Sequence, residues 1–271
     1  MKITVLLSML AITAVSAFAQ DIDQKNVPAV VVNAFQLKYA NADDVDWELR
    51  DGNYRVEFEL NDKDHDLWLD HKGAVLKHRQ ELWESEIPLG MIETVRSKCK
   101  YFDLDDAVRN EEGSDIHYYI NFEMNNKDCE FWMDEKGKLL RFKQELRESE
   151  IPASILTSIQ NQYDSFDLDD AEKTEEGSKV TIYVDGEVND KDHSFWYDDK
   201  GKLLKHNQDL RNSEIPLPVM TAISSLYAGY EIRDADKIEE GGKIIFDMEL
   251  KKSRERVNVK FSPSGKVLET S

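Results

Sequence analysis

Cysteine is scarce in this chain, because Cys99 and Cys129 are the only two among 271 residues. At most one internal disulfide can therefore form. Long apolar runs are also lacking. The one pronounced run, residues 3–15, is too short to span a bilayer as a helix. The sequence therefore predicts no membrane span.

Positive charge is in short supply. The chain has 35 Lys and Arg against 55 Asp and Glu, so its formal net charge is −20. Binding to nucleic acid requires a basic face, and so does docking on anionic lipid. The charge balance argues against both kinds of partner. It leaves two interpretations open, namely a surface charged for solubility or an acidic face for a basic partner.

Motifs of catalysis and cofactor binding are missing as well. The sequence contains no Gly-x-Ser-x-Gly, no P-loop, no Gly-x-Gly-x-x-Gly and no His-Glu-x-x-His. Pairs of Asp and Glu are abundant, but they recur at regular spacing on polar faces, as on a solvated surface. We therefore expect no catalytic residues, no cofactor and no enzymatic activity.

In place of such motifs the sequence has an internal repeat. Four glycines follow one another at intervals of 64 residues: Gly73, Gly137, Gly201 and Gly265. Four prolines are spaced by 60, 64 and 64 residues: Pro28, Pro88, Pro152 and Pro216. Such periods indicate a tandem array of one supersecondary unit. We predict repeat 1 at residues 20–86, repeat 2 at 87–150, repeat 3 at 151–214 and a shortened C-terminal repeat 4 at 215–271.

Residues 1–19 have the form of a cleavable secretory signal peptide. Lys2 provides a positive start, residues 3–15 an apolar core, and Ala17-Phe18-Ala19 a small-residue cleavage site. No cysteine follows that site, so a lipid anchor is not indicated. We expect a mature chain that starts at Gln20 and is periplasmic or secreted.

Each repeat has the pattern of one helix and four strands. Apolar residues spaced i, i+4, i+8 after each proline predict an amphipathic helix, as with Val31, Phe35 and Tyr39. Strict alternation, as in residues 54–60, predicts antiparallel strands with one buried face. The predicted fold class is α+β, with four tandem repeats of about 64 residues, each a helix packed on a four-stranded antiparallel sheet.

Two local features add detail. Serine followed by Glu stands just upstream of three of the predicted helices and favours a helix cap there: Ser85, Ser149 and Ser213. Gly186 stands where repeats 1 and 2 have Phe, so we expect a weak or bulged position in that strand.

Three tryptophans occupy equivalent positions on the third predicted strand, on the face opposite the helix stripe: Trp68, Trp132 and Trp196. An exposed Trp forgoes on the order of 2 kcal/mol of burial. The fourth repeat has Lys260 at this position. One interpretation is packing between successive repeats, with Lys260 marking a solvated end. The other is partner binding on an open face.

The sequence resembles a known family. The resemblance lies in an Ile-Pro start, a helix ending in Tyr, the run Asp44-Val45-Asp46-Trp47, the alternating residues 54–60 and a Trp-x-Asp-x-x-Gly turn at residues 68–73. Together they resemble the PepSY-like family of exported Bacteroidetes proteins, also described as β-lactamase-inhibitor-like, and residues 27–82 match it best. The resemblance implies small helix-on-sheet modules, often in tandem, and no catalytic residues. It does not identify a partner, because fold does not give function.

The two cysteines fill positions that other repeats fill differently. Cys99 stands at the helix position of Tyr39, Tyr163 and Tyr227, and Cys129 at the strand position of His65, His193 and Val257. Both positions lie on faces that should meet. In an oxidising compartment this predicts a Cys99–Cys129 disulfide. Its closed loop would contribute on the order of 3 kcal/mol. Two buried free thiols are the alternative.

Histidines provide the candidates for a metal site. His65 and His78 lie on the two arms of one predicted hairpin, and His193 and His206 lie on another. Cross-strand His pairs can bind zinc where a carboxylate joins them. Repeat 2 has no histidine at these positions, so we favour buried histidines hydrogen-bonded to tyrosine and predict no metal site.

The function that these features favour is non-enzymatic binding of a protein or peptide partner in the cell envelope, in an inhibitor-like or regulatory role. The alternative is a structural or divalent-cation-binding envelope protein that uses its carboxylates and histidine pairs. The identity of the partner is not encoded in any motif.

Overall fold

The structure is a computed structural model and describes residues 20–271, so the predicted signal peptide lies outside the described residues. These residues divide into two compact units. Unit 1 contains residues 20–87 and 106–119, and unit 2 contains residues 88–105 and 120–271. The predicted repeat boundaries stay a prediction.

The described residues form four α-helices and seventeen strands, and a helix followed by four strands occurs four times. We call these stretches segments 1 to 4. Segment 1 has α1 (Ala29–Lys38), β2 (Asp43–Arg50), β3 (Asn53–Glu59), β4 (Asp64–Leu69) and β5 (Val75–Glu81). Segment 2 has α2 (Leu89–Lys98), β6 (Asp103–Glu112), β7 (Asp115–Glu123), β8 (Asp128–Asp134) and β9 (Leu139–Glu145). Segment 3 has α3 (Ala153–Gln162), β10 (Asp167–Glu176), β11 (Lys179–Glu187), β12 (Asp192–Asp198) and β13 (Leu203–Asp209). Segment 4 has α4 (Leu217–Leu226), β14 (Glu231–Glu240), β15 (Lys243–Lys252), β16 (Glu255–Phe261) and β17 (Val267–Thr270).

The strands pair antiparallel in chain order. In unit 1 consecutive strands pair with each other from β1 (Gln20–Asp21) with β2 through β5 with β6. In unit 2 consecutive strands pair from β8 with β9 through β16 with β17. The last strand of one segment thus pairs with the first strand of the next, as β13 does with β14. The predicted mixture of helices and antiparallel sheet is confirmed.

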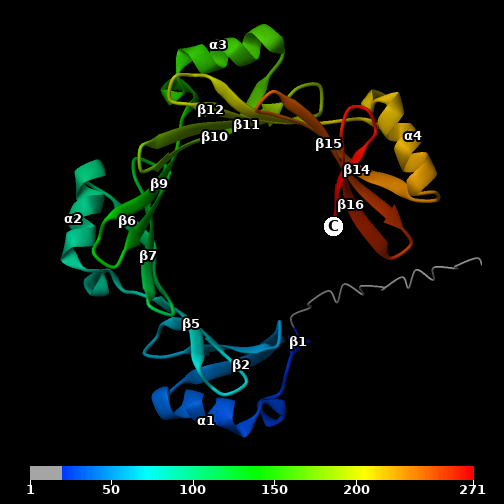
Figure 1. The fold of residues 1–271 in the computed structure, drawn as a ribbon. Helices are drawn as coiled ribbons and strands as arrows, with labels where there is room; N and C mark the ends of the chain where they lie inside the picture. The colour runs from blue at the N-terminus through cyan, green and yellow to red at the C-terminus, as the bar shows by residue number, and fades with distance from the viewer. Residues whose placement is uncertain (1–19) are drawn as a thin grey trace, which may run out of the picture. The chain divides into compact units, whose positions relative to one another are not determined.

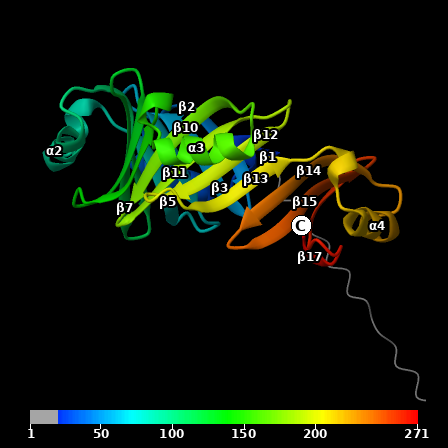
Figure 2. The same ribbon diagram turned by 90° about the horizontal axis from the view of Figure 1, so that it is seen from above.

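Each described core joins a helix to its strands. In segment 1, Val31 and Phe35 of α1 lie in one buried cluster with Val56, Phe58 and Leu67. Segments 3 and 4 have equivalent clusters around α3 and α4. Figure 1 shows α1 on one side of the strands β2 to β5 within unit 1, and Figures 1 and 2 show α3 and α4 on one side of their strands within unit 2. The opposite side of the strands is the face that bears the tryptophans.

Short 3₁₀ helices precede the α-helices: η1 (Gln24–Asn26), η2 (Glu84–Glu86), η3 (Glu148–Glu150) and η4 (Asn212–Glu214). The predicted serine caps are wrong, because the three serines lie inside these turns. The α-helices begin after Pro88, Pro152 and Pro216, without a side-chain cap. In η2, η3 and η4 the glutamate that ends the turn accepts a backbone N–H instead, as Glu150 does from Arg147 at 2.9 Å.

Gly186 lies at an irregular position, as predicted. Pairing between β10 and β11 shifts between Leu168 and Asp170, opposite Gly186. A Cβ atom on Gly186 would lie 2.1 Å from the carbonyl oxygen of Asp167 and 2.6 Å from the Phe166 ring. Phe166 therefore occupies the space that a side chain at this position would need.

None of the helices in residues 20–271 combines the length and the apolarity that a membrane crossing requires.

Candidate functional site

The face of segment 1 opposite α1 carries a row of directly paired side chains. Glu48 of β2, Arg55 of β3, Trp68 of β4 and Lys77 of β5 are opposite one another in the strand register. Neighbouring buried residues of β4 point to the helix, so alternation places Trp68 on the open face. The Lys77 ammonium lies 4.9 Å and the Arg55 guanidinium 5.4 Å from the Trp68 ring. The half-buried indole is thus covered by cations of its own segment.

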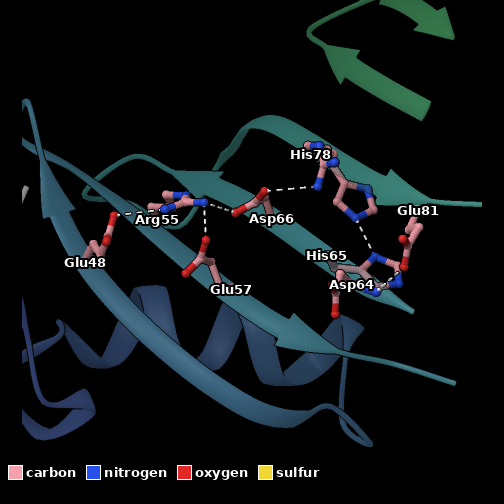
Figure 3. A network of polar contacts seen from close by, with 9 residues as sticks. Glu48, Arg55, Glu57, Asp64, His65, Asp66, His78 and Glu81 are labelled. Carbon is pink, nitrogen blue, oxygen red and sulfur yellow. Dashed lines mark hydrogen bonds and ion pairs between the residues drawn. The ribbon is translucent and has the colours of Figure 1, made fainter. Parts of the chain in front are cut away.

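Arg55 is the centre of a charged network beside this row (Figure 3). Its guanidinium donates to Glu48 at 3.2 Å and also to Glu57 and Asp66. Arg79 of β5 lies 3.7 Å from the second oxygen of Asp66. The face is therefore organised before any partner arrives, because its charged side chains hold one another in place.

Segments 2 and 3 repeat the arrangement with other residues. Arg141 lies 4.5 Å from the Trp132 ring, and Lys205 lies 4.5 Å from the Trp196 ring. In segment 3, Tyr183 packs against Trp196 at 5.1 Å and donates to Asp185 at 2.9 Å. Burial raises the pKa of Tyr183 to about 12, so its hydroxyl stays a donor. The aromatic–cation pair is a property of all three segments that have the Trp.

In segment 4 a charged residue stands at the position of the tryptophan. Lys260 stands at the Trp position and binds Glu269 at 2.6 Å. Around it lies a cavity of about 330 Å³, lined by five carboxylates: Asp234, Asp236, Asp247, Glu249 and Glu269. Burial and the nearby Asp234 and Asp209 raise the pKa of Asp236 to about 7. This part of the open face favours a cationic group.

The predicted histidine candidates come together in pairs on the helix side of the strands. His65 Nδ1 lies 3.0 Å from His78 Nε2 (Figure 3), and His193 Nδ1 lies 3.1 Å from His206 Nε2. All four rings are buried, with at most 7% of their surface exposed. The expectation of histidine–tyrosine hydrogen bonds is wrong for Tyr39, whose buried hydroxyl has no partner among the described residues. The tyrosines pack beside the pairs instead, with ring centroids 5.7 Å apart for Tyr39 and His78.

No carboxylate completes these pairs as metal ligands. Within residues 20–271, no group of three or more His, Cys, Asp or Glu side chains is placed to hold a metal ion. The zinc geometry that would need a joining carboxylate is therefore not present in the described part of the chain.

Cys99 and Cys129 are free, buried thiols, so the predicted disulfide is not formed in this structure. Cys99 Sγ donates to the carbonyl oxygen of Tyr101 at 2.6 Å. Burial raises the pKa of Cys129 to about 12, and nearby Cys99 contributes to that shift. The two thiols thus share one environment, as their positions in the repeat predicted, and the disulfide stays a prediction for the oxidised protein.

The sequence reasoning identified the tryptophans but missed the cations that cover them. The signal was present as a constant spacing, because each cation stands nine positions after its Trp: Trp68 and Lys77, Trp132 and Arg141, Trp196 and Lys205. Lys260 and Glu269 have the same spacing. The acidic cavity of segment 4 was also missed, because its carboxylates come from three separate strands.

The geometry defines a protein of recurring helices and antiparallel strands with an aromatic and charged open face. The chain belongs to the PepSY-like family, whose model is described as "Putative beta-lactamase-inhibitor-like, PepSY-like" and matches residues 13–77, 117–205 and 183–269. The resemblance noted in the sequence is confirmed. A comparison with curated proteins finds no match.

A comparison with solved structures finds several proteins from Bacteroides, among others. A protein from Bacteroides eggerthii, described as "putative periplasmic", is 15% identical, with a TM-score of 0.38, over 44% of this chain and 88% of that one. A DUF2874 family protein from Bacteroides ovatus is 19% identical, with a TM-score of 0.37, over 43% and 86%. A BLIP-like protein from Bacteroides fragilis is 18% identical, with a TM-score of 0.34, over 44% and 83%.

Proposed function

We propose that this chain is a non-enzymatic, exported protein built from four tandem helix-on-sheet modules, whose open strand faces bind a protein or peptide partner in the cell envelope. Each segment corresponds to one predicted repeat. Export rests on the signal-peptide pattern of residues 1–19. Membership in a family described as inhibitor-like supports a binding role rather than catalysis.

The observation that carries the proposal is the recurrence of a half-buried Trp beneath a cation on the face opposite the helices. Each cation comes from the neighbouring strand of the same segment, so a tryptophan and its cation meet without a following segment. This favours the partner-binding role of Trp68, Trp132 and Trp196 over packing between repeats. Indoles and guanidinium groups are the side chains that most often anchor protein interfaces.

The charged surroundings favour a partner with basic groups. The chain carries a net charge of −20, and the segment 4 cavity is lined by five carboxylates and one lysine. A Lys or Arg side chain of the partner would enter this cavity, while its apolar groups would cover the indoles. Long-range attraction between opposite charges would then raise the association rate.

Affinity capture tests the proposal. Protein comprising residues 20–271 is immobilised and exposed to envelope extract of its source organism at low salt and at about 0.5 M salt. A partner lost at high salt supports recognition through the acidic surface, because exposed charges are screened there. A partner retained at both salts supports recognition through the indoles. No enriched partner at either salt contradicts a binding function.

Variants of the tryptophans sharpen the test. Replacing Trp68 or Trp196 with Ala should weaken binding of the captured partner roughly 30-fold, corresponding to about 2 kcal/mol for an aromatic anchor. Trp83 provides a matched control, because it is 55% exposed and lies in the connector next to η2. Trp83→Ala should leave affinity unchanged. Equal effects of all three substitutions would argue against the open face.

A structural role with divalent-cation binding is the second candidate, favoured by the carboxylates of the segment 4 cavity. Ca²⁺ prefers six to eight oxygen ligands. Titration with Ca²⁺ should raise the unfolding temperature if this candidate is correct, and Asp247→Asn should abolish that rise.

A further inference from the structure

The two histidine pairs have a geometry beyond that of an ordinary hydrogen bond. In each pair the ring centroids are 5.3 Å apart, and the facing nitrogens are 3.0 or 3.1 Å apart. The centroid–centroid distance exceeds the nitrogen–nitrogen distance by about the radii of two imidazole rings. This is expected when both nitrogens lie on the line that joins the ring centres. The ring planes differ by only 13° and 22°. Two imidazole nitrogens therefore face each other in line.

This geometry selects the kind of ion that could bind. Within residues 20–271 two donors converge at each pair and no group of three or more does, which does not match the three or four ligands that Zn²⁺ takes from proteins. Imidazole also suits copper, and the d¹⁰ ions Cu⁺ and Ag⁺ accept two ligands in line. We propose that each histidine pair binds one such soft monovalent ion, between His65 Nδ1 and His78 Nε2 and between His193 Nδ1 and His206 Nε2.

The ion requires a small separation of the rings. Two metal–imidazole bonds of about 2.0 Å place the nitrogens about 4 Å apart, so the rings move apart by about 1 Å. Phe58 stacks on His65 and Phe195 stacks on His206, and both keep the rings in line during that movement. Tyr39 and Tyr163, 5.7 and 4.6 Å from His78 and His193, present aromatic rings beside a cation.

Protons compete weakly for these nitrogens. Burial, with the charge of its partner His65, lowers the pKa of His78 to about 4, and burial with His193 does the same for His206. The imidazoles are therefore neutral at pH 7 and their lone pairs are available. In the hydrogen-bonded pair one nitrogen carries a hydrogen, and ion binding moves it to the other nitrogen of the same ring without releasing a proton.

His65 has a nitrogen free to receive that hydrogen. Its Nε2 is buried and has no hydrogen-bond partner among the described residues, and the same is true of His193 Nε2. Each of these rings therefore has a second nitrogen that can carry the hydrogen when the facing nitrogen binds the ion.

The first pair has an approach from solvent. His65 lines a cavity of about 340 Å³ in segment 1, together with carboxylates that include Asp44, Glu59 and Asp64. Negative charge in a cavity raises the local concentration of cations. A cation thus has an attractive route to the edge of the histidine pair.

Segment 4 shows which residues can replace a histidine pair in a test variant. Segment 4 has Val257 and Thr270 at the two histidine positions, and Tyr227 at the place of Tyr39 and Tyr163, with its hydroxyl 3.4 Å from Thr270 Oγ1. The double substitution His65→Val with His78→Thr transfers this set to segment 1, and His193→Val with His206→Thr transfers it to segment 3.

Counting bound Ag⁺ by native mass spectrometry tests the proposal, in chloride-free buffer with imidazole as competitor. Because the thiols of Cys99 and Cys129 also bind Ag⁺, the differences between variants decide. Wild type should retain one more ion than either double variant. It should retain two more than the four-substitution variant, which combines both double substitutions. The control variant His71→Gln with His117→Gln, which changes the two exposed histidines, should retain as many ions as wild type. Equal counts in wild type and the four-substitution variant would overturn the proposal.

A second measurement needs no substitution in the pairs. ¹⁵N NMR of the wild-type imidazoles should show an Ag⁺-induced change at His65 Nδ1 and His78 Nε2, with the ring hydrogen of the donor moved to its other nitrogen. Unchanged imidazole spectra at saturating Ag⁺ would overturn the proposal even if ions are counted. The result is independent of partner binding on the open face.

Discussion

Lys127 is a buried charge that joins two parts of segment 2. It is 5% exposed, and its ammonium donates to both oxygens of Glu150 at 2.9 and 3.0 Å. The same contact occurs between Lys63 and Glu86 and between Lys191 and Glu214. Each lysine lies in the turn between the second and third strands, and each glutamate ends the 3₁₀ connector. The pair therefore holds the connector against the sheet.

We predict that removing the Glu150 side chain lowers the free energy of unfolding more than removing the Lys127 charge does. Glu150→Ala leaves a buried ammonium without a partner and also removes the acceptor of the Arg147 N–H, so it should cost roughly 3 kcal/mol. Lys127→Met leaves a glutamate that solvent can reach and should cost roughly 1 kcal/mol. Urea denaturation of both variants measures the difference. The exposed Lys136→Met should be neutral, and a larger loss for Lys127→Met than for Glu150→Ala would contradict the prediction.

At this scale the sequence indicates residue positions better than partners. The period-2 pattern places Trp68 and His65 on opposite faces of β4, as the structure has them. It cannot show that Lys127 pairs with Glu150, because 23 residues separate them and only the fold brings them together. The histidine–histidine bonds were missed for a related reason: the register that aligns them contains a bulge between Trp68 and Leu69 in segment 1.

Among the elements, β11 shows how one residue adapts a repeated strand. Gly186 replaces the Phe of the earlier repeats because Phe166 fills that space. We predict that Gly186→Phe destabilises the protein by about 3 kcal/mol or more, since a side chain there overlaps the Asp167 carbonyl oxygen. Gly177→Asn is the matched control, because Asn tolerates a φ of +59° and nothing lies within 4 Å of a Cβ there. Thermal unfolding of both variants measures the effect, and equal stability would show that β11 rearranges.

The end of α2 and strand β8 offer a second element-scale prediction. If the exported protein is oxidised, Cys99 and Cys129 should form a disulfide, since both thiols lie in one environment. Unreduced, denatured protein should then show no alkylatable thiol, and reduction should lower stability by on the order of 3 kcal/mol. Two alkylated thiols in unreduced protein would identify them as free. Cys129→Val, the segment 4 residue, should remove the effect of reductant.

For the whole molecule, the sequence predicts the order of elements and the faces they bury, because both follow from local periodicity. Residues 20–271 contain four α-helices, and four strands follow each of them. The division into two units was not predicted. One of its cuts falls between Ile87 and Pro88, next to the predicted start of repeat 2, but the other two fall within β6 and β7, where no proline or glycine run marks a boundary. Contacts between distant residues define such a division, and a single sequence does not reveal them.

The histidine pairs also give the molecule a defined response to acid. Burial lowers the pKa of His78, His193 and His206 to about 4 and also lowers the pKa of His65. Lys63 and Lys38 act in the same direction on the segment 1 pair, whereas Asp64, Glu81, Glu86 and Glu111 oppose them. In segment 3, Lys191 and Lys237 lower these pKa values, whereas Asp192, Glu214 and Glu239 raise them.

We predict that stability falls as the pH drops from about 6.5 to about 4. Above 6.5 both folded and unfolded histidines are neutral, so the pairs add no pH dependence. Below it the unfolded chain takes up protons that the folded chain excludes, which should cost roughly 3 kcal/mol at pH 4 for each histidine whose pKa is lowered to about 4. Urea midpoints measured across this range should fall less in the variant carrying His65→Val, His78→Thr, His193→Val and His206→Thr. His71→Gln with His117→Gln should follow wild type, because both side chains are exposed in both states. Parallel pH profiles for wild type and the four-substitution variant would mean that carboxylates with a lowered pKa, such as Glu150 hydrogen-bonded to Lys127, and not the histidine pairs, set the acid limit of the fold.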